Sequence, residues 1–288
     1  MNDIKNVSYD VIKYDHCPLD YVLEEIFKLG KLNMLTIGTG ECAYFTSKQL
    51  FNSDQLNYSY LLEDKEIVFG DLSSLEETFS LLNKSKYYSI VVITCIPAIM
   101  NLNLDYYIDQ YDKLILFNAP CFKKRNYQDL ISDLYYKIFS KIDLCIESKK
   151  EILDYEEYDY DLFIKKLTSN ILIINNPCYL KLGKYIENKY HILLIDNSKI
   201  NDLSFYKKYF SLLNIDENEI NEIENKLIKI DKNKEYQVNT RFDSLKDVVK
   251  KYGINIKLVN DKNNSIVIDE FDAFKSLINF VRSAYAIK

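Results

Sequence analysis

The run Gly38-Thr39-Gly40-Glu41-Cys42-Ala43-Tyr44-Phe45 is the stretch around which the chain is organised. It directly follows the apolar run Met34-Leu35-Thr36-Ile37, which predicts a β-strand that ends in a glycine turn. Glycine lets the backbone approach a neighbour closely or adopt a positive φ angle. A cysteine presented on such a turn can face a partner or an inorganic group, instead of packing into a core as free cysteines usually do.

Helical and strand patterns alternate along most of the remaining chain. Apolar residues repeat every three or four positions over Leu19–Leu29, which predicts an amphipathic helix that Pro18 opens and Gly30 ends. The apolar run Tyr88–Thr94 is typical of a strand buried on both faces of a parallel sheet, and Cys95 comes directly after it. This alternation predicts an α/β fold with Rossmann-like domains and mainly parallel sheets.

The length of the chain predicts two domains. We expect residues 1–160 to form an N-terminal, cysteine-bearing Rossmann-like domain and residues 161–288 to form a second, smaller α/β domain. The acidic, tyrosine-rich segment 147–161 reads as a linker or a solvated face. We also expect a short strand at Ile67–Phe69. Two further strands, at 254–259 and 265–268, are expected to pair as a hairpin.

The composition argues against several classes of protein. The 288 residues are 48% hydrophobic and 28% charged, which is enough for a full core. A net charge of −6 disfavours nucleic acid as the main partner, because duplex binding needs a clustered basic face. The sequence contains no run of 18 apolar residues and no apolar segment at its start. We therefore expect no membrane helix, no secretion signal and a cytoplasmic location.

Six cysteines in a reducing compartment point to metal binding or redox chemistry and away from structural disulfides. Zinc-finger and bacterial ferredoxin spacings are absent from the sequence. Cys17 begins a predicted helix, Cys42 lies on the glycine turn and Cys95 follows a strand, and loops at such positions gather on one side of an α/β sheet. Three thiolates from three loops can hold an iron–sulfur cluster whose fourth ligand comes from a partner chain.

The spacing of the cysteines leaves another interpretation open, since a free cysteine is usually a small buried hydrophobe. On this ground we assign Cys145, which follows a leucine in an apolar context, to the core. Cys121 and Cys178 each follow a proline in a predicted loop, so their assignment to the core is less secure.

Five short pieces of the chain match, in order and spacing, the motifs of one known family. They are Cys17-Pro18-Leu19, Gly38-x-x-x-Cys42-x-Tyr44-Phe45, Val68-Phe69-Gly70, Thr94-Cys95, and Ala119-Pro120-Cys121-Phe122, the last being similar to a Pro-Ser-Phe loop. Because of these five matches, about half of the chain resembles the nitrogenase component 1 family, most closely its MoFe-protein β-subunit type. The resemblance implies a shortened member, because the family usually has three Rossmann-like domains and this chain has room for two.

The resemblance also implies a cofactor and partners. In the family the corresponding three cysteines ligate an iron–sulfur cluster at a subunit interface, so Cys17, Cys42 and Cys95 are the expected ligands of a 4Fe-4S or larger interface cluster. The implied partners are a second subunit, in a homodimer or a paralogous heterodimer, and an ATP-dependent iron protein that donates electrons. No ligand of a further substrate-reducing cofactor is carried over, since Cys178 and His191 are better explained as structural residues.

These observations predict a nitrogenase-like oxidoreductase subunit that relays electrons to an unknown substrate. The alternative is a non-catalytic assembly or binding protein that retains the nitrogenase component 1 fold. The third interpretation is an α/β protein whose cysteines are core residues. Measuring iron in the purified protein, and then its electron acceptance from an iron protein, separates these hypotheses.

Overall fold

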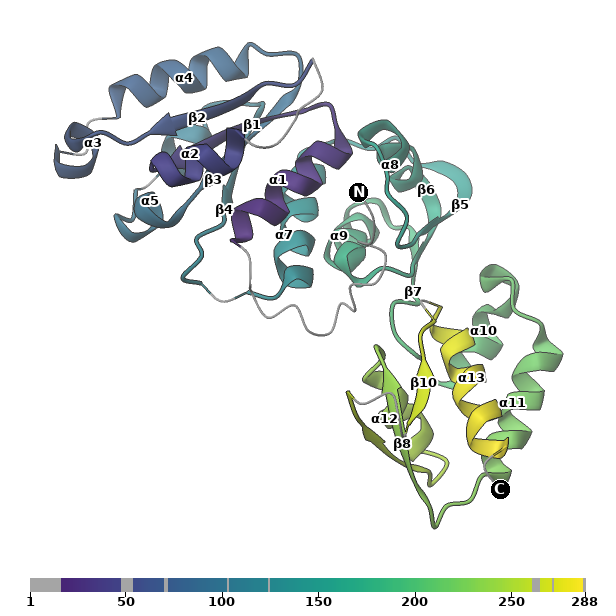
Figure 1. Ribbon diagram of the computed structural model, residues 1–288. Coiled ribbons are helices and arrows are strands. Elements are labelled where there is room, and N and C mark those ends of the chain that lie inside the picture. The colour runs from purple at the N-terminus through teal and green to yellow at the C-terminus, as the bar shows by residue number, and fades with distance from the viewer. Residues whose placement is uncertain are drawn as a thin grey trace.

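The computed structural model describes residues 17–47, 54–69, 72–102, 104–123, 125–260, 265–270 and 272–286. The strands of these residues form three separate sheets, in which neighbouring strands run parallel (Figure 1). The prediction of an α/β fold with mainly parallel sheets is confirmed. None of the helices in the described ranges has the length and apolar composition needed to cross a membrane.

The first sheet contains the strand that leads into the glycine turn. Its strand order is β2-β1-β3-β4. The four strands are β1 (Leu32–Gly38), β2 (Asn57–Leu61), β3 (Tyr88–Ile93) and β4 (Leu114–Asn118). All seven residues of β1 are buried, as expected of a central parallel strand covered on both faces.

Helices cover both faces of this first sheet. On one face, α1 (Pro18–Leu29) and α7 (Tyr127–Phe139) pack against Met34 and Val92. On the other, α4 (Ser73–Asn83) and α6 (Asp105–Ile108) pack against Leu35 and Val91. Neighbouring positions of one strand thus face opposite layers, as the two-residue period of a strand requires.

The short helices of this unit follow the carboxyl ends of the strands. They are α2 (Gly40–Ser47), α3 (Asp64–Phe69) and α5 (Cys95–Ile99). The expected strand at Ile67–Phe69 is wrong, because these residues end the helix α3. Ile67 is 43% and Val68 is 67% exposed, so their β-branched side chains are not covered as they are in an inner strand of a sheet.

A buried carboxylate fixes α1 to α7. Glu25 is only 8% exposed, and it accepts hydrogen bonds from the hydroxyl groups of Tyr127 at 3.0 Å and Tyr135 at 3.1 Å. Lys28 pairs with the same carboxylate at 3.3 Å. Because a buried charge is tolerated only with partners, these contacts define how the first helix of the chain sits against a helix more than a hundred residues later.

The second sheet has the order β5-β6-β7. Its elements are β5 (Glu147–Leu153), α8 (Tyr160–Leu167), β6 (Ser169–Ile174), η2 (Pro177–Tyr179), α9 (Leu180–Tyr190) and β7 (Leu193–Asp196). The linker expected over 147–161 is wrong for its first half, because β5 pairs with β6. One continuous apolar core includes residues of α1, α7 and α9, so the first two sheets are packed together.

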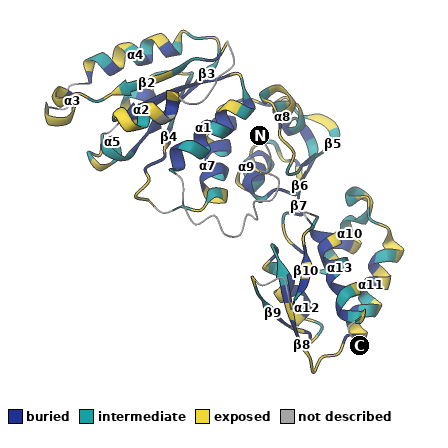
Figure 2. Ribbon diagram, viewed as in Figure 1, coloured by how far each residue is buried: buried dark blue, intermediate teal, exposed yellow. Residues whose placement is uncertain are grey.

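The third sheet has the order β10-β8-β9 and its own core. Its elements are α10 (Leu203–Leu213), α11 (Glu217–Lys229), β8 (Glu235–Thr240), α12 (Ser244–Lys250), β9 (Asn255–Leu258), β10 (Ile266–Ile268) and α13 (Ala273–Ala286). The expected hairpin is wrong, because β9 and β10 flank β8 on opposite sides and both run parallel to it. Figure 2 shows the buried residues on the helix faces that meet the sheets.

The strands therefore group into three sheets where two domains were expected. The predicted boundary between residues 160 and 161 falls between β5 and β6, which pair with each other. The division of the chain into domains stays a prediction, and the separate core of the third sheet offers a division that begins near residue 200.

Candidate functional site

Four cysteines lie at the carboxyl edge of the first sheet. Cys42 lies in the first turn of α2 after β1, Cys95 begins α5 after β3, and Cys121 lies in the loop that follows β4. Cys17 reaches the same edge because α1 leads back into the start of β1 through the turn at Gly30, so the helix begins where the strand ends (Figure 1). In open α/β sheets, ligands bind at this edge.

Local structure places Cys17 at the very start of α1. Cys17 is the N-cap residue with extended backbone angles, and Pro18 occupies the first helical position, as predicted. The helix ends at Gly30, whose φ of 63° lies in the region that favours glycine. The expected helix over Leu19–Leu29 and both of its boundaries are confirmed.

Hydrogen bonds hold the ends of the three neighbouring strands β1, β3 and β4 level. The amide N–H and the hydroxyl of Thr94 both donate to the carbonyl oxygen of Ile37, at 3.2 and 2.8 Å. The amide N–H of Ala119 donates to the carbonyl oxygen of Ile93 at 2.9 Å. The ladder thus continues past the last paired residues of β1, β3 and β4, and it brings the three following loops to one level.

Gly38 is required at the turn because of the space around it. A Cβ atom at this position would lie 3.1 Å from Cys42 Sγ and closer than 3.0 Å to the hydroxyl of Thr94. At Gly40, by contrast, a Cβ atom would meet nothing within 4 Å. The close approach expected of the glycine turn therefore belongs to Gly38, which lets the Cys42 thiol lie directly against the end of β1.

The thiols of Cys95 and Cys121 are in direct contact. Their Sγ atoms lie 2.9 Å apart, and the amide N–H of Cys121 donates to Cys95 Sγ at 3.2 Å. Cys121 is exposed, whereas Cys17, Cys42 and Cys95 are half-buried. The sequence analysis left Cys121 outside the expected site, although its position directly after a buried strand is the same signal that singled out Cys95.

Electrostatic interactions connect the four thiols. Burial raises the pKa of the Cys17 thiol, and negative charge on Cys95 and Cys42 raises it further. The hydrogen bond with Cys95, together with burial, raises the pKa of Cys121 to about 11. Four thiolates gathered in one region disfavour one another's charge, and bound iron cations would offset that cost.

The donor set agrees with an iron–sulfur cluster in its chemistry. Thiolates are the usual ligands of these clusters, and Cys17, Cys42 and Cys95 supply three of the four that a 2Fe-2S or 4Fe-4S cluster usually has. In the described ranges of the chain, no three His, Cys, Asp or Glu side chains are arranged to hold a single metal ion. The ligands of a cluster bind different irons and lie further apart than those of one ion, so the thiols fit the group by type and by place.

The remaining cysteines lie elsewhere. The assignment of Cys145 to the core is wrong, because this residue is exposed in the loop between α7 and β5. Cys178 is 4% exposed within the first core, and burial raises the pKa of its thiol to about 12. His191 has a left-handed φ of 54° and forms the C-cap of α9. The positions of Cys178 and His191 agree with the structural roles expected of them.

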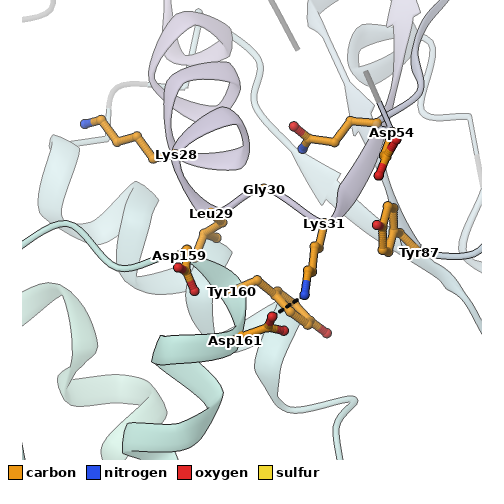
Figure 3. A pocket seen from close by; sticks show the side chains of 10 residues that line it. Lys28, Leu29, Gly30, Lys31, Asp54, Tyr87, Asp159, Tyr160 and Asp161 are labelled. Atoms are coloured by element: carbon orange, nitrogen blue, oxygen red, sulfur yellow. Dashed lines mark hydrogen bonds and ion pairs between the residues drawn. The ribbon is translucent and has the colours of Figure 1, made fainter. Parts of the chain in front are cut away.

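A polar pocket lies at the other end of α1 (Figure 3). It has a volume of about 320 Å³ and is bordered by Lys31, Tyr87, Tyr160 and Asp161 among others. Lys31 pairs with Asp161 across it, which ties the end of α1 to α8. Because a helix of this length spans about 18 Å, the pocket is separate from the cysteines. It is a junction between the first two sheets.

Comparisons with known proteins give the fold. No protein-family model matches the chain, and a search of curated proteins returns no significant match. Among solved structures the chain is similar to nitrogenase Cp1, with a TM-score of 0.50 and 12% sequence identity, over 94% of this chain and 74% of that chain. The resemblance expected from the sequence is confirmed for the fold, and membership in the family stays a prediction. The chain has a nitrogenase component 1-like fold.

Proposed function

We propose that this protein is a nitrogenase-like oxidoreductase subunit that binds an iron–sulfur cluster through Cys17, Cys42 and Cys95. The observation that carries the proposal is the gathering of these cysteines at the carboxyl edge of the first sheet. They come from three different segments of the chain, and the hydrogen-bonded strand ends bring two of them to one level. Soft thiolate ligands in this number and place are typical of a protein that holds iron and sulfide.

The cluster would accept and pass on single electrons, and the protein supplies its ligands, burial and orientation. Cys17 is held by the N-terminal turn of α1, and Cys42 by the space that Gly38 leaves open. Thr94 is 2% exposed and joins the loop of Cys95 to the end of β1. Cys17 and Cys42 also pack against the first core, and such support favours a fixed ligand geometry.

The surface beside the cysteines supports the proposal of a second subunit. Large apolar side chains close in sequence to three of the cysteines are exposed, with Tyr44 at 61%, Ile99 at 66% and Phe122 at 48%. They follow Cys42, Cys95 and Cys121 by one to four positions in the sequence. Exposed apolar side chains around a site are typical of a surface that another protein covers. We propose that a second copy or a paralogue covers this edge, and that an ATP-dependent iron protein donates the electrons.

Iron and acid-labile sulfide in anaerobically purified protein test the proposal. We expect both in the wild type, and a sharp loss of both in Cys42→Ala, because this thiol has no replacement at the glycine turn. Cys145→Ala is the matched control, since it removes an exposed cysteine outside the site. Protein that lacks iron after expression with an intact cluster-assembly system would contradict the redox function.

The alternative is a non-catalytic assembly or binding protein with the same fold. It is favoured by the low sequence identity of 12% to nitrogenase Cp1, at which the similarity extends to the fold alone, because a fold can be kept while its function changes. The two functions differ in electron transfer. Protein that carries iron and accepts electrons from an iron protein with MgATP supports the oxidoreductase, whereas iron-loaded protein that stays oxidised supports the alternative.

A further inference from the structure

We infer that Cys95 and Cys121 form a reversible dithiol–disulfide pair whose oxidation withdraws Cys95 from metal binding. The pairing of the two thiols is inferred from the contact between their sulfur atoms. The consequence for metal binding rests on the proposed function, in which Cys95 is a ligand. The pair would therefore regulate whether the protein can take up its cluster.

The strand ends bring the two residues together from positions 26 residues apart. β3 and β4 are adjacent, with Ile93 paired to Asn118, so the two cysteines follow neighbouring strands by only a few residues. Neighbouring strands lie about 4.8 Å apart, which is within the range of Cα separations that a disulfide can join. The Sγ atoms are already 2.9 Å apart, so a small side-chain rotation brings them to bonding distance.

The difference in exposure gives the two thiols separate roles. Cys121 is exposed and follows β4 in an open loop, so a small oxidant reaches it first. Cys95 is half-buried and already contacts the Cys121 sulfur, so it is placed to attack that sulfur next. An exposed thiol with a second thiol in contact can close an intramolecular disulfide.

The reaction is two thiol–disulfide exchanges with a small-molecule disulfide such as oxidised glutathione. The Cys121 sulfur, having lost its proton, attacks the small disulfide, which forms a mixed disulfide and releases one small thiol. The Cys95 sulfur, having lost its proton, then attacks Cys121 Sγ, which forms the protein disulfide and releases the second small thiol. Two protein thiols are oxidised, one small disulfide is reduced, and the two protons end on the released thiols.

The test uses the full-length protein without its cluster in a series of glutathione redox buffers. After alkylation of free thiols and proteolysis, mass spectrometry measures the peptide pair joined through Cys95 and Cys121. We expect this link to form in large excess over links to Cys17 and to be lost on addition of dithiothreitol. Cys121→Ser abolishes it, whereas Cys145→Ser, at an exposed cysteine elsewhere, leaves it unchanged.

Iron uptake in the same buffers tests the consequence. Oxidised wild type should lose most of its uptake and recover it on reduction, while Cys121→Ser takes up iron equally in oxidising and reducing buffer. A glutathione adduct on Cys121 without the link overturns the pair. The regulation is overturned if oxidation lowers iron uptake equally in the wild type and in Cys121→Ser. It is also overturned if Cys121→Ser takes up no iron in reducing buffer. If reduced wild type binds no iron, the cluster function and the regulation fail, and the link alone decides whether the pair exists.

Discussion

Substituting Gly38 by alanine should destabilise the first sheet, whereas the same substitution at Gly40 should not. The new Cβ would collide with the hydroxyl of Thr94, which is buried and donates to Ile37 at 2.8 Å. Overpacking costs about 1–3 kcal/mol, and displacing a buried hydrogen-bonded hydroxyl adds about 1–3 kcal/mol. We therefore expect Gly38→Ala to lose roughly 2–6 kcal/mol of stability.

Gly40 is the matched control because it begins α2 with open space around its Cα. Replacing a helical glycine by alanine contributes up to about 1 kcal/mol of stability. Neither glycine is among the residues with positive φ, so backbone strain of that kind contributes to neither substitution. The comparison therefore isolates the steric contribution of the close approach at Gly38.

Thermal unfolding followed by circular dichroism measures the difference. For a unit of 150–250 residues, each kcal/mol shifts Tm by about 2–4 °C, so Gly38→Ala should lower Tm by roughly 4–24 °C. The double variant Gly38→Ala/Thr94→Ala should recover part of the loss, because the colliding hydroxyl is gone. A Gly38→Ala protein as stable as Gly40→Ala, or a double variant with no recovery, would refute the steric explanation.

Three further substitutions test the surrounding core. Glu25→Gln should cost about 1–3 kcal/mol in urea unfolding, because the buried carboxylate accepts two tyrosine hydroxyls. Partial burial raises the pKa of the Asp133 carboxyl, but hydrogen bonds from Lys181 and Arg125 outweigh burial and lower this pKa. The contribution of Asp133 is therefore fully present above the unfolded pKa of about 3.9 and is lost as the pH falls through the lowered native pKa, so Asp133→Asn should destabilise at pH 7 and progressively less as the pH falls below 4. Cys178→Ser should cost about 1–3 kcal/mol, since it buries a hydroxyl among apolar side chains; an unchanged urea midpoint would contradict this.

The parts of the fold that bury apolar runs could be predicted from sequence. β1 and β3 are covered on both faces, and their buried apolar residues stand close together in the sequence, as Met34, Leu35 and Ile37 and as Ile90–Ile93. β5, with the sequence ESKKEIL, lies at a sheet edge and buries only its last residue fully, so its pattern reads as a linker. At β8 only Tyr236 and Val238 are buried, which is too short an alternation to recognise although this strand is central in its sheet.

The sequence predicted a cysteine site at the end of the first sheet, but it identified only three of the four cysteines that gather there. Cys17, Cys42 and Cys95 could be selected because each lies where one element ends or begins. Cys121 meets the same criterion, but its contact with Cys95 depends on β4 being the neighbour of β3, which is a property of strand order. Strand order arises from tertiary packing, and no local pattern in the sequence encodes it.

The dependence of α1 on α7 has a consequence for synthesis. The apolar face of α1 is covered by residues of α7, which follows the loop of Cys121 in the chain. At 5–20 residues per second, the roughly one hundred residues between the first and last of the four cysteines take on the order of 5–20 s to emerge. During this interval Cys17 is already made, while Cys42, Cys95 and Cys121 are added one after another. A nascent chain therefore presents an incomplete set of thiols to the cell, and under the proposed function the cluster would be loaded after the translation of α7.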